Sequence, residues 1–350
     1  MANLSNNLFY YATKELSQDA FICWLCSFAL EDSKGIDEEL TVCANDLLSE
    51  FLKRGLNSEI NTENLQLKTI DKQIGNIDVL LTVKYDNKNY KIIIEDKIYS
   101  CEHDDQLRRY REQIKSKDVT VIGIYYKTGF QADYSEVEKA GYFIFNRTDI
   151  INVLKNCNST NDIFKNYYEY WKDFEEITQS YKDNKLCDWD WRQINGFYDE
   201  IKTLLNEHEC WSGYDYVSNK SGGFWGLWYG IDDDAIDFGS FRAAIYLQSE
   251  IKWIESKSQY DYKICIKLEN QSKDDEKEKM YELKKKILEK IEQYGFTKPN
   301  RVGSGTHVTV GVMKGLESIS TYEEFRNTII ESVDSYKKMV RDIQQDNKEI

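Results

Sequence analysis

Acidic and basic side chains lie at the end of a strongly apolar segment, with a spacing that could support metal-assisted chemistry. The isoleucines 92–94 are followed directly by Glu95, Asp96 and Lys97. Because side chains alternate across a strand, Glu95 and Lys97 share one face and Asp96 points to the other. Charges in such a place are costly to bury without a partner ion. The segment therefore predicts a site where an acid and a lysine lie side by side.

A second carboxylate, Asp78, precedes this triplet. The β-rich segment that it begins and the segment that ends in the triplet read as two strands joined by a hairpin turn near Asn87. A two-residue turn there predicts that Asp78 pairs roughly with Asp96 or Lys97. Asp78 and Glu95 would then converge at one end of the sheet.

Two converging carboxylates offer the hard oxygen ligands that Mg²⁺ prefers, and Mn²⁺ suits the same ligands. A metal held there can polarise a phosphoryl oxygen and lower the pKa of a bound water. A neighbouring lysine such as Lys97 can orient or deprotonate that water and stabilise developing negative charge. A bound metal ion, an activated water and a neighbouring lysine are the groups that hydrolysis of a phosphodiester requires.

The polar helix expected over residues 102–115 adds two functional faces. Three of its side chains, His103, Gln106 and Tyr110, are spaced so that they share a face that can look back into the site. A second face is basic and suits a phosphate backbone. The candidate nucleic-acid-binding residues are Arg108, Arg109, Arg111, Lys115 and His103.

The elements that must position these residues fill the first half of the chain. Apolar periodicity predicts helices over 10–30 and 38–53, and alternation predicts a further strand over 65–70. After the polar helix come strands over 119–126 and 142–145. We expect an α/β domain over residues 1–185.

The second half predicts an α+β domain over residues 186–350, with a role in recognition, sensing or dimerisation. Aromatic residues that flank Ser221-Gly222-Gly223 form either a base-stacking platform or the buried core of a hairpin. The expected strands are 224–231, 241–249, 262–268 and 307–313, and the expected helices are 194–206, 276–294 and 322–342.

Composition restricts the class of protein. The chain has 350 residues and a net charge of −15, so it is no general polyanion binder and any nucleic-acid contact needs a local basic face or a metal. No apolar run is long enough to cross a membrane, and the polar N-terminus predicts no secretory signal. We therefore expect a cytoplasmic protein whose eight cysteines form no disulfides.

The order of the motifs resembles the PD-(D/E)xK nuclease superfamily, in its RecB-like and λ-exonuclease-like branch. The N-terminal run from Glu15 to Phe21, followed by Trp24-Leu25, also resembles a bacterial family of uncharacterised PD-(D/E)xK proteins. The superfamily's proline is absent, with Ile77 before the first acid. The matching motifs are G-x-x-D (Gly75, Asp78), E-x-K (Glu95, Lys97) and Q-x-x-x-Y (Gln106, Tyr110).

The resemblance, which covers about residues 9–150, implies an α-β-β-β-α-β core and assigns a role to each motif residue. It implies catalytic functions for Asp78, Glu95, Lys97, Gln106 and Tyr110. It also implies metal binding by Asp78, by Glu95, by the backbone carbonyl of Asp96 and by Glu15, an acidic position on the first helix.

The residues and the resemblance together predict a Mg²⁺- or Mn²⁺-dependent nuclease that cuts DNA. The resemblance, by association and not through any residue, implies defence against phage or foreign DNA as the expected setting. A two-fold dimer would let two sites face the two strands of a duplex. Two alternatives remain: a nuclease-fold protein that binds nucleic acid or a partner without cutting, and an interaction protein with an acidic recruiting surface. The complete set of Asp78, Glu95 and Lys97 argues against both.

Overall fold

Two units make up the chain, Met1–Glu176 and Ile177–Ile350. The computed structural model describes residues 6–219, 222–232, 234–238, 241–272, 277–303 and 305–348. The boundary expected between residues 185 and 186 lies further along the chain than this division. The first residues, whose polarity entered the sequence argument, lie outside the described part, as does Ser221.

The helices of the first unit begin and end where the sequence supplies caps. Asp37 accepts a hydrogen bond from the Leu40 N–H at 3.0 Å at the start of one helix, and Asn57 ends it in the left-handed conformation (φ 50°). The helical segments that begin in this unit are η1 (Leu8–Tyr10), α1 (Glu15–Ser27), η2 (Glu31–Ser33), α2 (Glu38–Leu56), η3 (Thr62–Asn64), α3 (Gln106–Ile114), α4 (Ser135–Lys139), α5 (Arg147–Leu154) and α6 (Asp162–Gln179).

A five-stranded mixed sheet forms the centre of the first unit, in the order β1-β2-β3-β4-β5. The first three strands are antiparallel neighbours, and the last two pair in parallel. The expected α-β-β-β-α-β core is therefore present. The strands are β1 (Leu65–Ile74), β2 (Ile77–Tyr85), β3 (Lys88–Lys97), β4 (Val119–Lys127) and β5 (Tyr142–Asn146).

The register of the β2–β3 hairpin corrects one expectation. Asp86 and Asn87 form the two-residue turn, both with positive φ, and Tyr85 pairs with Lys88. Val79 then pairs with Ile94, so the next residue, Asp78, lies opposite Glu95. The turn expected from the sequence lies about half a residue to one residue further along the chain than the observed turn, and Asp96 or Lys97 was therefore expected as the partner of Asp78 in place of Glu95.

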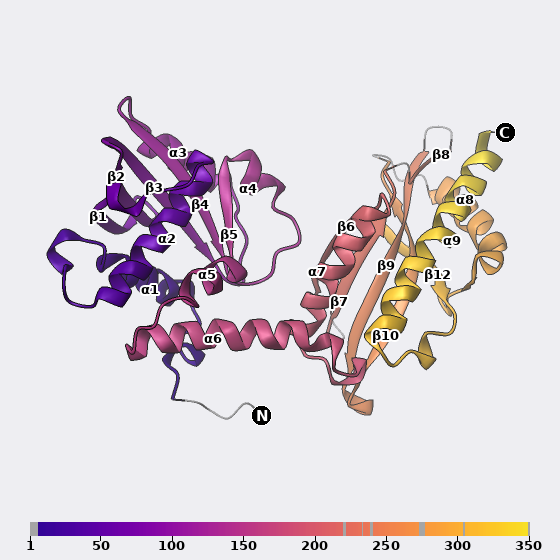
Figure 1. The fold of residues 1–350 in the computed structure, drawn as a ribbon. Helices are drawn as coiled ribbons and strands as arrows, with labels where there is room; N and C mark the ends of the chain where they lie inside the picture. Colours follow the sequence, from indigo (N-terminus) through magenta and orange to yellow (C-terminus); the bar gives the residue numbers. More distant parts are fainter. Residues whose placement is uncertain are drawn as a thin grey trace. The chain divides into compact units, whose positions relative to one another are not determined.

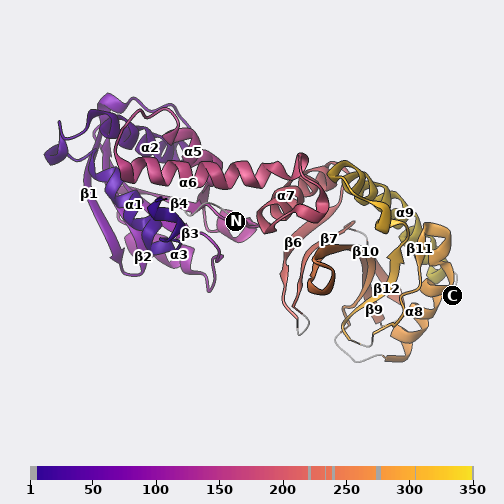
Figure 2. The same cartoon turned by 90° about the horizontal axis from the view of Figure 1, so that it is seen from below.

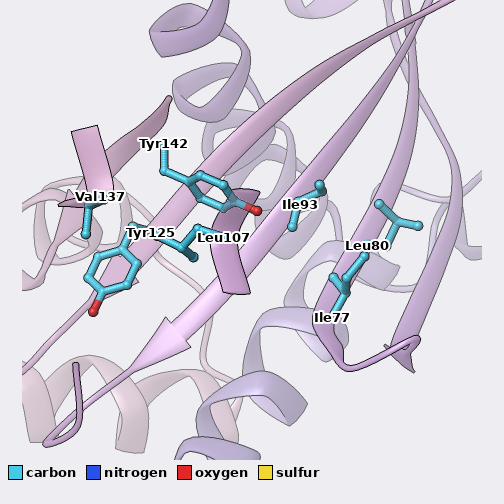
Figure 3. Packing of buried hydrophobic residues seen from close by; sticks show 7 residues of the cluster. All are labelled: Ile77, Leu80, Ile93, Leu107, Tyr125, Val137 and Tyr142. Carbon is cyan, nitrogen blue, oxygen red and sulfur yellow. The ribbon is translucent and has the colours of Figure 1, made fainter. Parts of the chain in front are cut away.

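Helices cover both faces of the sheet, α1 and α2 on one and α3 and α4 on the other (Figure 1). Between the sheet and α3 lies a cluster of buried apolar side chains that holds α3 against β2, β3 and β4. Figure 3 shows this cluster, which comprises Ile77, Leu80, Ile93, Leu107, Tyr125, Val137 and Tyr142.

Two helices are shorter than the sequence indicated. The first spans Glu15–Ser27 rather than residues 10–30, and α3 begins at Gln106 rather than at residue 102. Asp104 and Asp105 precede α3 with positive φ values of 53° and 55°, which interrupts a right-handed helix. The chain between β3 and α3 is consequently a loop.

The second unit is an antiparallel sheet with helices packed on one face (Figure 2). On α7 (Trp191–Glu207), the Tyr198 hydroxyl donates to the Trp225 carbonyl at 3.1 Å, and on α9 (Tyr322–Lys348) the Tyr336 hydroxyl donates to the Ile245 carbonyl at 2.6 Å. The strand order is β11-β12-β10-β9-β7-β6, and β8 pairs with β9.

This unit has longer and more numerous strands than the sequence indicated. The helical segments are η4 (Ser180–Lys182), η5 (Leu186–Asp188), α7 (Trp191–Glu207), η6 (Glu255–Lys257), α8 (Lys277–Lys290), η7 (Ile291–Tyr294), η8 (Leu316–Ser318) and α9 (Tyr322–Lys348). The strands are β6 (Trp211–Val217), β7 (Phe224–Gly230), β8 (Ala235–Phe238), β9 (Phe241–Ile254), β10 (Gln259–Asn270), β11 (Phe296–Thr297) and β12 (His307–Met313).

The aromatic segment of the second half forms the β6–β7 hairpin. Tyr214 and Tyr229 are buried beneath the helices, where their hydroxyls contact Asp199 on α7 and Ser332 on α9. For these two residues the hairpin-core interpretation is confirmed. Among the described residues, no helix is long and apolar enough to cross a membrane.

Candidate active site

The carboxylate of Asp78 lies at the start of β2, beside the end of β3. Its Oδ2 accepts a hydrogen bond from the backbone N–H of Asp96 at 3.0 Å. Its Oδ1 accepts one from the side chain of Gln73, at the end of β1, at 3.2 Å. The hairpin register therefore brings Asp78 and Glu95 to one end of the sheet, as the sequence predicted.

Glu95 is 2% exposed and lies at the centre of a short hydrogen-bonded chain. Its Oε1 receives the Lys97 ammonium at 2.5 Å and the Gln106 amide at 2.7 Å. Its Oε2 has no hydrogen-bond partner among the residues that the structure describes. The alternation of β3 thus places Glu95 and Lys97 on the face that α3 covers, and the first residue of α3 reaches the same carboxylate.

Burial and repulsion act on this carboxylate together. Burial, and after it the charge of Asp78, raises the pKa of Glu95, while the Lys97 ammonium opposes both; together these effects set the pKa at about 7. Burial by itself would lower the pKa of Lys97, but Glu95 beside it raises that pKa above its ordinary value. The lysine is therefore an ammonium at neutral pH.

On the opposite face of β3, Asp96 is fully buried against α1. Its Oδ1 accepts a hydrogen bond from the Gln18 amide, and its Oδ2 has no partner among the described residues. Asp19 lies beside it, and burial and the charge of Asp78 raise the pKa of Asp19 to about 6. The Gln73 amide donates to both Asp19 and Asp78, at 3.2 Å each.

The sequence argument did not identify Gln18, Asp19 or Gln73 as site residues. No clear signal was available, because Gln18 and Asp19 stand in the polar start of α1, before the apolar run that begins at Ala20, and only the structure shows that both are buried. Buried polar groups need partners, so such a pair indicates a polar site beneath the helix. Gln73 offers no signal either, since β1 ends there among polar residues.

Glu15, the acid expected to reach the metal from the first helix, holds the chain that leaves β3. Its Oε1 accepts hydrogen bonds from the Ile98 N–H at 3.1 Å and the Ser100 hydroxyl at 2.7 Å. A buried lysine that the sequence argument missed, Lys127, donates to the Ile98 and Ser100 carbonyls at 3.0 and 2.6 Å. Metal binding by Glu15 stays a prediction.

The remaining candidates lie on or beside α3. Tyr110 is half-buried, and burial together with the charge of Glu95 raises its pKa. His103 is exposed in the loop before α3 and lines a small cavity of about 220 Å³ with Gln106. The structure thus brings Gln106 to the acids and leaves His103 at the surface.

The basic residues of α3 differ in their surroundings. Arg108 pairs with Asp105 at 3.3 Å, Lys115 pairs with Glu112 at 3.4 Å, and Arg111 donates to the Gly141 carbonyl. Arg109 is exposed and makes no ion pair with the described residues. Their role in nucleic-acid binding stays a prediction.

The acids at the end of the sheet fit a divalent cation. No group of three or more His, Cys, Asp and Glu side chains in the described part of the chain is arranged as a metal cluster. The side-chain donors here are two, Asp78 and Glu95, and the buried Glu95 Oε2 lacks a partner. A cation beside it would offset the burial and the repulsion from Asp78 that raise the pKa of Glu95.

Comparison with known proteins gives one family. Residues 7–183 match the family model described as the PD-(D/E)XK nuclease superfamily. No curated protein matches the chain, and neither does any solved structure. The matched range contains α1 and all five strands of the first sheet, and hence every residue of the candidate site.

Proposed function

Because the chain belongs to the PD-(D/E)XK nuclease superfamily, we propose that it is a Mg²⁺- or Mn²⁺-dependent deoxyribonuclease that hydrolyses phosphodiester bonds. The family itself is one of nucleases, so membership indicates nuclease activity in general. The proposal adds the metal and the substrate.

One observation carries the proposal. Glu95 is buried at a strand end with one oxygen unpartnered, a second carboxylate opposite it and an ammonium 2.5 Å from its other oxygen. A structural ion pair needs no second acid and leaves no buried oxygen unpartnered. A site that binds a cation and an anionic phosphate accounts for both features.

The chain's residues take distinct roles in this proposal. Asp78, Glu95 and the backbone carbonyl of Asp96 would hold the cation, which supplies a Lewis acid toward the phosphate when bound. Lys97, an ammonium at neutral pH, places positive charge beside the position where negative charge develops. Gln106 fixes the orientation of Glu95 through its hydrogen bond at 2.7 Å.

DNA is the proposed partner, and a homodimer is the proposed assembly. The net charge of −15 gives little general attraction to a polyanion, so binding requires local basic residues such as those of α3. Two sites related by a two-fold axis could address both strands of a duplex. Light scattering of the protein with and without duplex DNA tests the dimer.

The test of the activity compares the wild-type chain with Asp78→Asn, Glu95→Gln and Lys97→Met in a cleavage assay. We expect wild-type cutting with Mg²⁺ or Mn²⁺, none with EDTA, and none by the three variants. Lys91→Met, on the same strand but away from the site, is the matched control and should cut normally. Unchanged cutting by Glu95→Gln or Lys97→Met would reject the assigned site.

Defence against phage or foreign DNA is the proposed setting. Support comes only from the association of such nucleases with defence, since the residues themselves do not carry it. Phage plating on cells that express the wild-type chain or Lys97→Ala tests this. Equal plating on both would remove the defence role while leaving the nuclease activity open to the cleavage assay.

A further inference from the structure

We propose that Gln18 is a positioning residue of this nuclease site: it holds the Asp96 side chain behind β3 and thereby sets the main chain between Glu95 and Lys97. This inference rests on the proposed function and assigns a role to α1.

Asp96 links the two faces of the sheet. Its side chain points toward α1, where the Gln18 amide is the hydrogen-bond donor to Oδ1. Its backbone N–H points along the sheet to Asp78 and donates to Oδ2 at 3.0 Å. A shift of the Asp96 side chain would therefore move the peptide that holds Asp78 and that connects Glu95 to Lys97.

Gln18 is itself held in one orientation. Its Oε1 accepts hydrogen bonds from the Thr128 hydroxyl at 3.0 Å and the Tyr167 hydroxyl at 3.1 Å. Tyr126 lies against the Tyr167 hydroxyl at 3.1 Å and satisfies it in turn. An amide oxygen has two lone pairs, so these two hydroxyls use both and leave the NH₂ group for Asp96.

The position of Gln18 on α1 explains why a polar residue is tolerated there. It is 2% exposed, on the buried side of α1, which also carries Asp19 and apolar side chains such as Ile22 and Leu25. A buried amide with an apolar environment and no role would cost free energy, whereas this one satisfies three buried polar groups. In metal sites generally, residues that do not touch the metal orient its ligands by hydrogen bonds.

The experiment uses the full chain with Gln18→Met, which keeps the length of the side chain and removes its polar atoms. Hydrogen exchange at the Asp96 amide should accelerate at least about 10-fold, because its bond to Asp78 loosens. The Mn²⁺ dissociation constant, measured by calorimetry, should rise about 10- to 100-fold. With saturating Mn²⁺, kcat should fall while KM for DNA stays within about twofold.

Matched variants separate positioning from simple loss of packing. Gln66→Met, on β1, makes the same chemical change away from the site and should behave as wild type in all three measurements. Thr128→Val removes one hydrogen-bond donor to Gln18. It should change the exchange rate at Asp96, the Mn²⁺ dissociation constant and kcat in the same direction as Gln18→Met, but to a smaller extent. If Gln18→Met does not fold, Thr128→Val decides the proposal.

Unchanged exchange at Asp96 in a folded Gln18→Met protein would overturn the proposal. Faster exchange with unchanged Mn²⁺ affinity and kcat would overturn it too, because the bond to Asp78 would then not matter to the site. A wild-type chain that neither binds Mn²⁺ nor cuts DNA would reject the proposed function instead, and the exchange at Asp96 would still decide whether Gln18 holds this peptide.

Discussion

Glu95 lies between one carboxylate and one ammonium, and this arrangement defines the site at the level of residues. Burial and the charge of Asp78 opposite it disfavour its ionised form, while Lys97 at 2.5 Å favours that form. The result is a pKa near the middle of the physiological range for a group that is almost fully buried. Both the stability of the metal-free protein and its chemistry should depend on this residue.

Stability without metal should fall as the pH rises through this pKa. Glu95 titrates near 4.5 when unfolded and near 7 when folded, so between these values the folded state binds more protons. The free energy of unfolding should therefore fall across that window, by about 3 kcal/mol from this residue. Urea unfolding of wild type and Glu95→Gln between pH 4.5 and 7 measures the difference.

The Glu95→Gln protein lacks this titration, so it should gain stability relative to wild type as the pH rises. Acids remote from Glu95 titrate alike in both proteins and cancel in the comparison. A constant difference between the two proteins over this range would contradict the raised pKa of Glu95.

Replacement of Lys97 by alanine should reduce the cleavage rate by about 100-fold or more and leave DNA affinity within about threefold. The ammonium acts on charge that develops in the transition state, so ground-state binding changes little. Single-turnover cleavage and fluorescence anisotropy with Ca²⁺ in place of Mg²⁺ measure the two quantities. Equal losses in affinity and rate would assign Lys97 to binding instead.

At the scale of elements, the chain that leaves β3 is held from three sides. Glu15 on α1 binds the Ile98 N–H, Lys127 on β4 binds the Ile98 carbonyl, and Gly129 approaches that carbonyl closely. The first residue of α3 then reaches back to Glu95. Helix α1, strand β4 and helix α3 therefore all contact the end of β3 and hold it in place.

Gly129→Ala should disturb this strand end directly. A β-carbon at Gly129 would lie 1.8 Å from the Ile98 carbonyl oxygen, so the backbone must shift. We expect a loss of about 1–3 kcal/mol of stability, as for other overpacked sites, together with reduced cleavage. Gly303→Ala, where the nearest atom is 3.7 Å away, is the control for the substitution itself. Wild-type stability and cutting by Gly129→Ala would show that the strand end adapts freely.

Helix α3 also carries the proposed phosphate contacts, and Arg109 is the sharpest test. It is exposed and makes no ion pair with the described residues, whereas Arg111 is engaged with the Gly141 carbonyl. Arg109→Ala should weaken DNA binding equally across sequences and reduce the salt dependence by about one phosphate contact. Lys139→Ala, on α4, is the control. An unchanged salt dependence would remove Arg109 from the interface.

At the scale of the whole molecule, every candidate catalytic residue lies in the first unit. That unit has its own buried core, in which Phe21 stacks on Tyr167 with ring centroids 3.5 Å apart. The second unit has a separate core between its sheet and α7 and α9. The two halves of the chain can therefore be tested for separate contributions.

A fragment of residues 1–185 should fold and bind Mn²⁺ but cut DNA weakly or without the preference of the full chain. The reason is that the acids and Lys97 are complete within it, while the acidic chain needs a further surface for productive binding. Circular dichroism, calorimetry and cleavage assays compare fragment and full chain. A fragment with full activity, preference and oligomeric state would give the second unit another role.

The sequence by itself determined the acid–lysine strand, its partner strand and the helix with Gln106, because these follow from local periodicity. Alternation along β3 is sufficient to place Glu95 and Lys97 on one face. The bounds of α3 were less predictable, since the positive φ values of Asp104 and Asp105 leave only a weak local signal. In the second unit, β8 and β11 were not expected, and β6 was expected only as one strand of the alternative aromatic hairpin, because short or aromatic strands owe their stability to their neighbours.

Only the tertiary structure decided what lies behind and beside that strand. Gln18 meets Asp96 across 78 residues of sequence, and Lys127 meets Ile98 across 29. Such contacts depend on how helices and strands pack, and no local pattern encodes them. The exact register of Asp78 depended on a single turn residue, because a one-residue slip changes every cross-strand partner. The sequence therefore predicted the candidate catalytic residues, whereas the residues that hold them in place, such as Gln18 and Lys127, were found only in the tertiary structure.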